Sequence, residues 1–174
     1  MISIEKYIEL AFPIIEFCAK EGQEKEIKKN HLWYLYRQFF YGFGMFFTKN
    51  YYSQKAELIF KDLYETYLLE CVEKNIEPKM IKIDSFGWNT QPLIDKGRNK
   101  LILEHMYTGT MFRNDIQDLF NKDILSIEEI KNLATSNYKV CLITRCENKG
   151  LHKTHRGLDP MNYYSEQKII IVNK

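Results

Sequence analysis

Hydrophobic residues in the first part of the chain recur every three or four positions, which is the spacing of one face of an α-helix. One such stripe spans residues 4–18, a second, made of aromatic side chains, spans residues 30–47, and a third spans residues 56–75. Gly42 and Gly44 lie within the aromatic stripe and weaken a helix, which indicates a bend or a close approach of another backbone there. We therefore predict three core-facing helices.

The periodicity changes after Pro78. Residues 80–84 alternate between apolar and polar side chains, as expected for a short, half-buried strand. Residues 100–106 form a stronger strand pattern, and the polar residues 96–99 before it are turn formers. The sequence thus predicts that a sheet begins at residue 80 and includes a hairpin across residues 96–99.

The C-terminal part of the chain predicts two short helices and two more strands. Residues 112–120 have helical spacing, and Ser126 with Glu129 matches a capping box, which marks a helix start. Apolar runs at residues 140–144 and 169–172 predict two buried strands joined by a polar loop.

Together these elements predict one α+β domain. Residues 1–78 would form a three-helix half that packs on a small mixed β-sheet, and residues 79–174 would supply that sheet and two further short helices. The length of 174 residues, with 45% hydrophobic and 28% charged residues, is that of a chain able to bury its own core.

Two features of the sequence bear on its cellular location. No apolar run reaches the roughly 18 residues of a membrane helix, and the first residues lack a secretory pattern. The four cysteines are scattered and form no Cys-x-x-Cys pair, which argues against a disulfide scaffold. We expect a cytoplasmic protein with no membrane partner.

Charge and motifs narrow the function classes only partly. The net charge of +2 permits nucleic-acid binding but creates no strong field by itself. The P-loop, the dinucleotide glycine fingerprint, the serine nucleophile elbow and the His-Glu-x-x-His zinc helix are all absent, which excludes enzymes of those kinds.

Acidic and basic residues at the predicted strand ends form the first candidate site. It consists of Asp84, Glu104, Lys100 and His105, of which Asp84 and Glu104 supply the oxygen ligands that Mg²⁺ prefers. His105 is an alternative general acid or base, although it and Glu104 should face opposite sides of a strand. A surface carboxylate on an edge strand is the competing interpretation of Glu104.

About 25 residues around this site resemble the restriction-endonuclease-like nucleases. That family carries an aspartate and then a carboxylate-x-lysine on neighbouring strands, and Asp95 and Glu104 occupy those positions, but Met106 stands where the lysine belongs. Lys100 is the candidate substitute. Because Asp95 would lie on the order of 13 Å from the strand partner of Glu104, Asp84 is the better second metal ligand. The resemblance implies Mg²⁺-dependent cleavage of nucleic acid and a role in bacterial defence.

The polar loop between the last two strands is the second candidate site. Its basic side chains have the charge and reach to contact phosphate groups. They are Arg145, Lys149, Lys153, His155 and Arg156. The same region holds atoms suited to zinc, although their spacing is loose. These are Cys141, Cys146, His152 and His155.

The sequence leaves two function classes open. The first is a nucleic-acid-acting protein, specifically a metal-dependent nuclease with Asp84, Glu104 and Lys100 or His105 near the chemistry. The second is a non-catalytic interaction module that binds a protein partner through exposed aromatics such as Trp88, Tyr163 and Tyr164. Self-association into a homodimer is open under either hypothesis.

Overall fold

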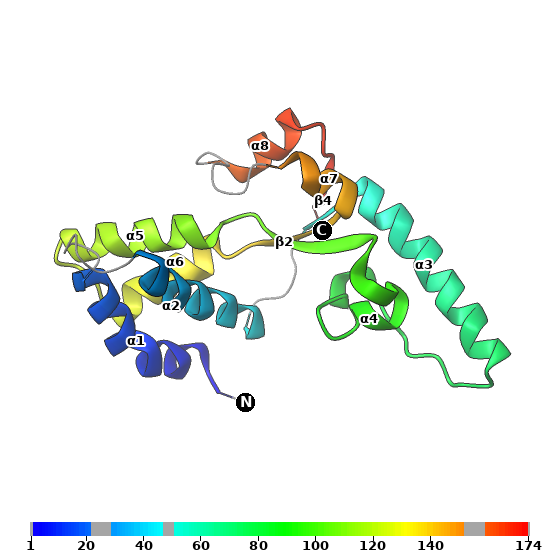
Figure 1. The fold of residues 1–174 in the computed structure, drawn as a ribbon, viewed down its shortest axis with the longest axis horizontal. Coiled ribbons are helices and arrows are strands. Elements are labelled where there is room, and N and C mark those ends of the chain that lie inside the picture. The colour runs from blue at the N-terminus through cyan, green and yellow to red at the C-terminus, as the bar shows by residue number, and fades with distance from the viewer. Residues whose placement is uncertain (1, 22–28, 47–50, 152–158, 174) are drawn as a thin grey trace. The chain divides into compact units, whose positions relative to one another are not determined.

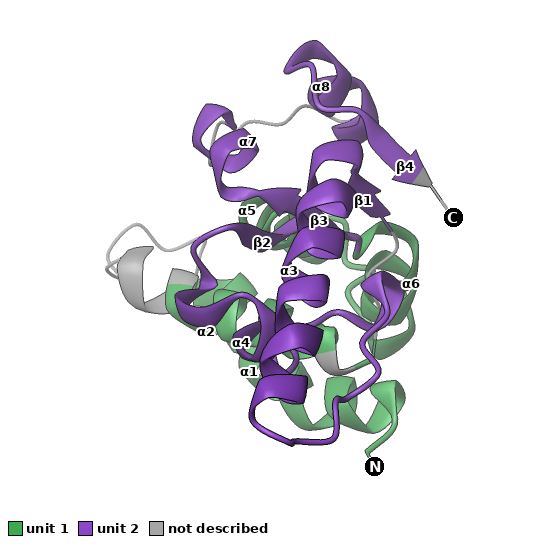
Figure 2. Ribbon diagram, turned by 90° about the vertical axis from the view of Figure 1, so that its right-hand side faces the viewer, with its two compact units in different colours: residues 1–47, 107–138 green, residues 48–106, 139–174 purple. Residues whose placement is uncertain are grey.

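A computed structural model of the chain describes residues 2–21, 29–46, 51–151 and 159–173. The chain forms two compact units, each built from two separate stretches of sequence (Figure 2). Unit 1 comprises residues 1–47 and 107–138, and unit 2 comprises residues 48–106 and 139–174. This grouping differs from the expected boundary at residue 78, because the sheet-forming segments come from both parts of the chain.

Unit 1 is helical. It contains α1 (Ile4–Glu21), α2 (Lys29–Gly42), α5 (Gly109–Asn121) and α6 (Ile127–Asn137), with a short 3₁₀ turn, η1 (Phe43–Met45), after α2 (Figure 1). Helix α1 packs against the other three helices, and α2 also packs against α5.

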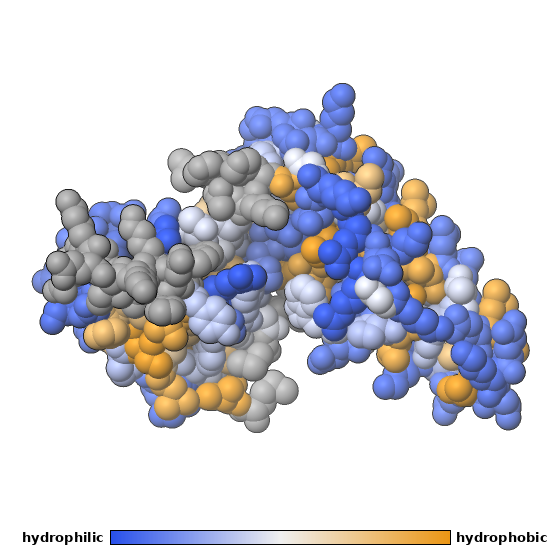
Figure 3. Space-filling model, in the orientation of Figure 1, coloured by the Kyte–Doolittle hydropathy of each residue, from blue (hydrophilic) through white to orange (hydrophobic). Residues whose placement is uncertain are grey.

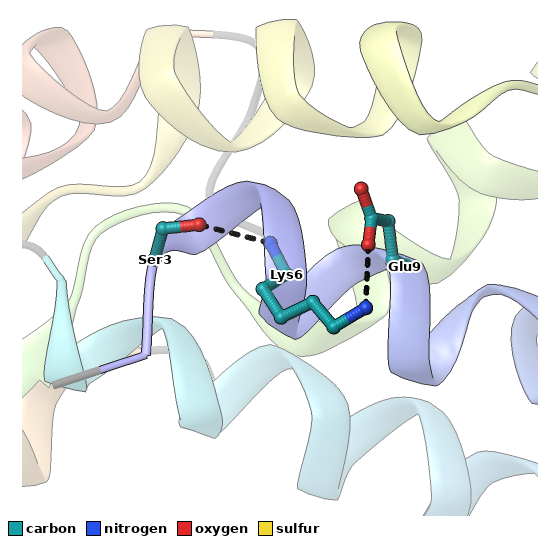
Figure 4. Close-up of polar contacts among 3 residues, drawn as sticks. All are labelled: Ser3, Lys6 and Glu9. Atoms are coloured by element: carbon teal, nitrogen blue, oxygen red, sulfur yellow. Dashed lines mark hydrogen bonds and ion pairs between the residues drawn. The ribbon is translucent and has the colours of Figure 1, made fainter.

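The first helix has a local start signal that its sequence supplies. The Ser3 hydroxyl accepts a hydrogen bond from the Lys6 amide at 3.1 Å, and the Lys6 ammonium lies 3.0 Å from the Glu9 carboxylate (Figure 4). Such a cap satisfies an amide that has no partner within the helix. Helix α1 then continues through Pro13 to Glu21, one residue before Gly22.

Aromatic rings form the core of unit 1. Phe40, Phe43 and Phe112 are fully buried, and ring centroids lie 5.5 Å apart for Phe40 and Phe112. Phe40 also lies 5.2 Å from Tyr138. The aromatic stripe therefore does form the buried face of a core helix, α2, as its spacing predicts.

Unit 2 holds a four-stranded mixed sheet in the order β2-β3-β1-β4. The strands are β1 (Tyr51–Ser53), β2 (Leu101–His105), β3 (Val140–Thr144) and β4 (Ile171–Asn173). The β1–β3 pair is parallel, and the β2–β3 and β1–β4 pairs are antiparallel. Helix α3 (Gln54–Glu73) packs against β1, β2 and β3, and all five residues of β3 are buried. The predicted α+β fold class is confirmed.

Short helices complete unit 2. They are α4 (Gln91–Ile94), α7 (Arg145–Gly150) and α8 (Pro160–Glu166), with 3₁₀ turns η2 (Ile83–Ser85) and η3 (Lys96–Arg98). A core cluster of Met106, Cys141, Ile143, Leu151, Tyr164 and Ile169 joins the sheet to the segments around α7 and α8.

Two sequence predictions in this unit are wrong. Residues 80–84 form no strand: Met80 is 82% exposed, Ile81 is buried, and a 3₁₀ turn begins at Ile83. The hairpin across residues 96–99 does not form either, because α4 and η3 precede β2, which pairs with β3 instead. The alternation at 80–84 was that of an exposed connection with one buried side chain.

Other predictions are confirmed. The strands at residues 100–106 and 140–144 are β2 and β3, and the Ser126 hydroxyl accepts a hydrogen bond from the Glu129 amide at the start of α6. Among the helices of the described residues, none combines the length and the apolar composition that crossing a bilayer requires.

Candidate functional site

The two parallel strands of unit 2 end side by side, and each leads directly into a helix. Strand β1 ends at Ser53, whose hydroxyl accepts from the Ala56 amide of α3 at 3.0 Å. Strand β3 ends at Thr144, whose hydroxyl accepts from the Glu147 amide of α7 at 3.0 Å. Ligand sites in sheets with parallel strands lie preferentially beyond such carboxyl ends.

A half-buried carboxylate ties these two strand ends together. Glu147 accepts hydrogen bonds from the Thr144 amide at 2.8 Å and from the Ser53 hydroxyl at 2.7 Å. Both Ser53 and Thr144 are buried. The Glu147 side chain therefore belongs to the framework of the site.

A cavity of about 580 Å³ opens next to these strand ends. Its walls come from α3, α7, the residues just before β2 and the segment between α8 and β4. Ligand sites in proteins range from about 300 to 1,000 Å³, so the volume suits a ligand of nucleotide size. Four basic residues line this cavity, namely Lys55, Lys100, Arg145 and Lys168; we refer to it as the cationic cavity.

The four cations lack carboxylate partners within the described part of the chain. Other lysines of unit 2 do have them: Lys61 pairs with Glu57 at 2.9 Å, and both Lys74 and Lys96 pair with Glu70. Glu147 is the one acidic residue among the described residues that line the cavity, and its carboxylate already accepts two hydrogen bonds. The cavity thus carries an excess of positive charge.

Backbone contacts hold two of these cations in position. The Arg145 Nε donates to the Arg98 carbonyl at 2.9 Å, and the Arg145 amide donates to the Lys100 carbonyl at 2.8 Å. The buried Asp95 carboxylate accepts from the amides of Asn99, Lys100 and Leu101 at 2.9–3.3 Å. Asp95 therefore organises the turn that presents Lys100.

Lys168 has an unusual backbone conformation. Its φ of 58° is left-handed, just after the end of α8, and its amide donates to the Ser165 carbonyl at 2.9 Å. Glycine is the residue that most often ends a helix in this conformation. A lysine here accepts a small conformational cost and places its side chain on the cationic cavity.

The structure brings together only part of the predicted catalytic group. Lys100 lines the cavity, whereas Asp84 lies in η2, and Glu104 and His105 lie in β2 opposite Cys141 and Val140. Asp84, Glu104 and His105 are half-buried and do not line the cavity. The expectation that Asp84 lies on a strand beside Glu104 is wrong, because residues 80–84 form no strand.

The acidic residues do not form a larger cluster. Within the described ranges, no group of three or more histidine, cysteine, aspartate or glutamate residues is placed to hold a metal ion. Glu104 lies on β2, which is an edge strand of the sheet. Asp95, the aspartate of the nuclease resemblance, holds a turn through its backbone contacts.

The predicted phosphate-contacting residues fall into three groups. Arg145 lines the cavity, and Lys149 is exposed on α7 without lining it. Lys153, His155 and Arg156 lie outside the described residues, as does His152 of the zinc alternative. Of the cysteines in that alternative, Cys141 is buried and Cys146 is exposed on α7.

The sequence predicted a loop where α7 begins at Arg145. Thr144-x-x-Glu147 is itself a complete capping box, with both reciprocal hydrogen bonds present. That signature predicts a helix start and could have located α7.

The sequence analysis also missed Lys55 and Lys168. No local pattern indicates that they lie near Lys100 and Arg145, because pairing within the sheet alone brings these distant segments together.

Comparison with known proteins adds no relative: no family model, curated protein or solved structure matches the chain.

Proposed function

We propose that unit 2 binds nucleic acid through phosphate groups placed in the cationic cavity. The observation that carries this proposal is the set of four cations around one cavity, Lys55, Lys100, Arg145 and Lys168, none of them paired with a carboxylate of the described residues. Phosphate contacts need positive charge and reach, and they dominate the affinity of proteins for nucleic acids.

Two further features support a phosphate-bearing ligand. Lys55 lies in the first turn of α3, a helix of 20 residues whose N-terminal end favours negative charge. Leu58 and Ile59 of the same helix form an apolar part of the wall. A ligand that combines a phosphate with a base can use both surfaces.

Metal-dependent cleavage remains a separate prediction. The geometry does not support it directly, since Asp84 and Glu104 lie on different elements and neither lines the cationic cavity. Incubating the protein and its Glu104→Gln variant with DNA and RNA, in Mg²⁺ and in EDTA, tests this chemistry independently of binding.

One of the aromatic residues predicted to anchor a protein partner is not on the surface. Tyr164 is fully buried in the core of unit 2, whereas Trp88 is exposed beside the Arg98 guanidinium. Tyr163 is half-buried against the same core, so of the three proposed anchors Trp88 alone is exposed, and nucleic-acid binding is the better-supported function.

Fluorescence polarisation with labelled single- and double-stranded DNA and RNA tests the proposal. We expect affinity to fall with added salt, and each lost phosphate contact to reduce the salt slope by roughly 0.7–0.9. Lys55→Gln and Lys168→Gly should each weaken binding. Lys168→Gly also suits the left-handed backbone, so it separates lost charge from lost stability.

The matched control is Lys61→Gln, which lies on the same helix as Lys55 but pairs with Glu57. It should leave both affinity and salt slope unchanged. Equal weakening by Lys61→Gln and Lys55→Gln would mean that general surface charge, and not the cavity, binds the ligand. Full competition by free mononucleotide would point to a small phosphorylated ligand instead of a polymer.

A further inference from the structure

An exposed tryptophan of unit 2 is connected to the cationic cavity through Arg98. Trp88 precedes α4 and is 47% exposed. The Arg98 guanidinium lies over its ring, 5.9 Å from the ring centroid, and the Arg98 Nη2 donates to the Trp88 carbonyl at 3.3 Å. The Arg98 carbonyl in turn accepts from the Arg145 Nε at 2.9 Å, and Arg145 lines the cavity. Arg98 therefore links Trp88 to the cavity wall.

The turn that carries Arg98 has an unusual backbone. Gly97 and Arg98 are both left-handed, with φ of 79° and 54°. Glycine adopts this conformation readily, whereas arginine adopts it at a cost in free energy. The Asp95 carboxylate, which is 2% exposed, holds the end of the turn by accepting from the Lys100 amide. The same turn thus places Arg98 beside Trp88 and Lys100 on the cationic cavity.

The concave surface of unit 2 extends beyond the cationic cavity. A second hollow of about 230 Å³ is lined by residues of α3 and α4, and it shares Asn99 and Lys100 with the cationic cavity. Both hollows therefore lie against the turn that Asp95 holds. A single nucleotide suits the cationic cavity alone, whereas a chain of nucleotides is long enough to contact both hollows.

The surface over α4 is mainly hydrophilic (Figure 3). Proteins commonly bind one another through broad apolar patches. This view of the described residues shows no such patch over α4. The surroundings of α4 thus suit a charged, polar ligand better than the apolar face of a protein partner.

The two features suit the two parts of an unpaired nucleotide. Cations bind its phosphate, and an exposed aromatic ring stacks on its base. Bases within a duplex are already stacked on one another, whereas those of a single strand are free to stack on an aromatic side chain. An exposed tryptophan linked to a cationic cavity therefore favours a single strand over a duplex.

We propose that the nucleic acid bound by unit 2 is single-stranded, with phosphates in the cationic cavity and a neighbouring base stacked on Trp88. Trp88 then distinguishes single strands from duplexes, and Arg98 positions its ring. This inference rests on the function proposed above and adds the class of nucleic acid.

Fluorescence polarisation tests the proposal with an oligonucleotide of about 16 nucleotides that lacks self-complementarity, and with the duplex that it forms with its complement. We expect tighter binding of the single strand. Trp88→Ala should weaken single-strand binding about ten-fold, the contribution of one stacked base, and should leave duplex affinity unchanged. A merely structural role of Trp88 would lower both affinities together.

Two further variants show whether stacking is the cause. Trp88→Phe keeps a flat ring and should retain most of the single-strand affinity. Tyr34→Ala is the matched control, because Tyr34 is 59% exposed on α2 of unit 1, and it should change neither affinity. In a Trp33→Phe background Trp88 is the only tryptophan of the chain, and single-stranded but not duplex DNA should quench its fluorescence.

Three results would overturn the proposal. They are equal affinity of the wild type for single strand and duplex, no change in single-strand affinity in Trp88→Ala, and an equal loss of both affinities in that variant. Each of them, with salt-dependent binding retained by the wild type, contradicts the single-strand inference and leaves the proposed function standing. Binding of neither single strand nor duplex would overturn both.

Discussion

The two units hold their cavities in different ways. In unit 1, aromatic rings pack around α2, and a cavity of about 250 Å³ between α1 and α2 has no charged residue among the described residues that line it. In unit 2, the carboxylates of Asp95 and Glu147 accept amide and hydroxyl hydrogens at the edges of the cationic cavity. The first arrangement is sensitive to volume and shape, and the second to hydrogen bonds and charge. Substitutions can therefore affect one unit and leave the other unchanged.

Phe112→Ala should cause the largest loss of unfolding free energy, and it tests whether the two units unfold independently. Phe112 is fully buried and lies 5.5–5.8 Å from the rings of Phe39, Phe40 and Phe43. Removing such a ring costs about 3–5 kcal/mol of unfolding free energy. Amide hydrogen exchange should show lost protection in α1, α2, α5 and α6, while oligonucleotide binding by unit 2 persists.

The matched substitution in unit 2 is Phe86→Ala. Phe86 is buried and packs edge-on against Phe60 at 5.4 Å. It should reduce protection in the sheet and in α3 and spare unit 1. Loss of protection throughout the chain in both variants would instead support the single domain that the sequence predicts.

Gly42→Ala should cause an intermediate loss of unfolding free energy, and the loss should be confined to unit 1. A Cβ atom at this position would lie 1.8 Å from the Tyr7 hydroxyl oxygen, so the Tyr7 ring must leave its stack on Phe39. Overpacking of this kind costs about 1–3 kcal/mol. Urea unfolding measures the loss, and Gly44→Ala is the control, since its Cβ would lie 3.2 Å from the Tyr138 hydroxyl oxygen. Helix propensity favours alanine over glycine at both positions, so a cost for Gly44→Ala as large as for Gly42→Ala would mean that contact with Tyr7 does not decide the loss.

The sequence predicted most helices correctly because each depends on local information. The stripe at residues 4–18 and the aromatic stripe of α2 encode their buried faces. The pair of glycines predicted a bend or a close approach of another backbone, whereas the group that lies close to Gly42 is the Tyr7 side chain. The strand expected at residues 80–84 failed because a strand requires a neighbour, and five alternating residues do not specify one.

The candidate site was harder to predict for a related reason. Lys100 and Arg145 were selected, but Lys55 and Lys168 join them only through the order of the strands, in which β1 lies between β3 and β4. Asp84 and Glu104 were expected on adjacent strands, an expectation that depended on the missing strand. Pairing between distant segments, and not local pattern, therefore determines which charged residues meet.

Glu147→Gln should cause the smallest loss of unfolding free energy. It should lower stability and at the same time strengthen oligonucleotide binding. Thr144 and Ser53 both donate to one oxygen of the Glu147 carboxylate, and the amide oxygen of glutamine can take its place but without the charge that strengthens both bonds, so the weaker cap should cost about 1 kcal/mol of unfolding free energy. Removing the single carboxylate from the cationic cavity should at the same time tighten oligonucleotide binding. Glu57→Gln is the control, because its carboxylate pairs with Lys61 on the surface of α3 and does not line the cavity. Weaker binding by Glu147→Gln, measured in a folded sample by fluorescence polarisation, would mean that the carboxylate contacts the ligand. The contrast between a cavity without charged lining residues in unit 1 and one whose cations alone hold the ligand in unit 2 would then no longer hold.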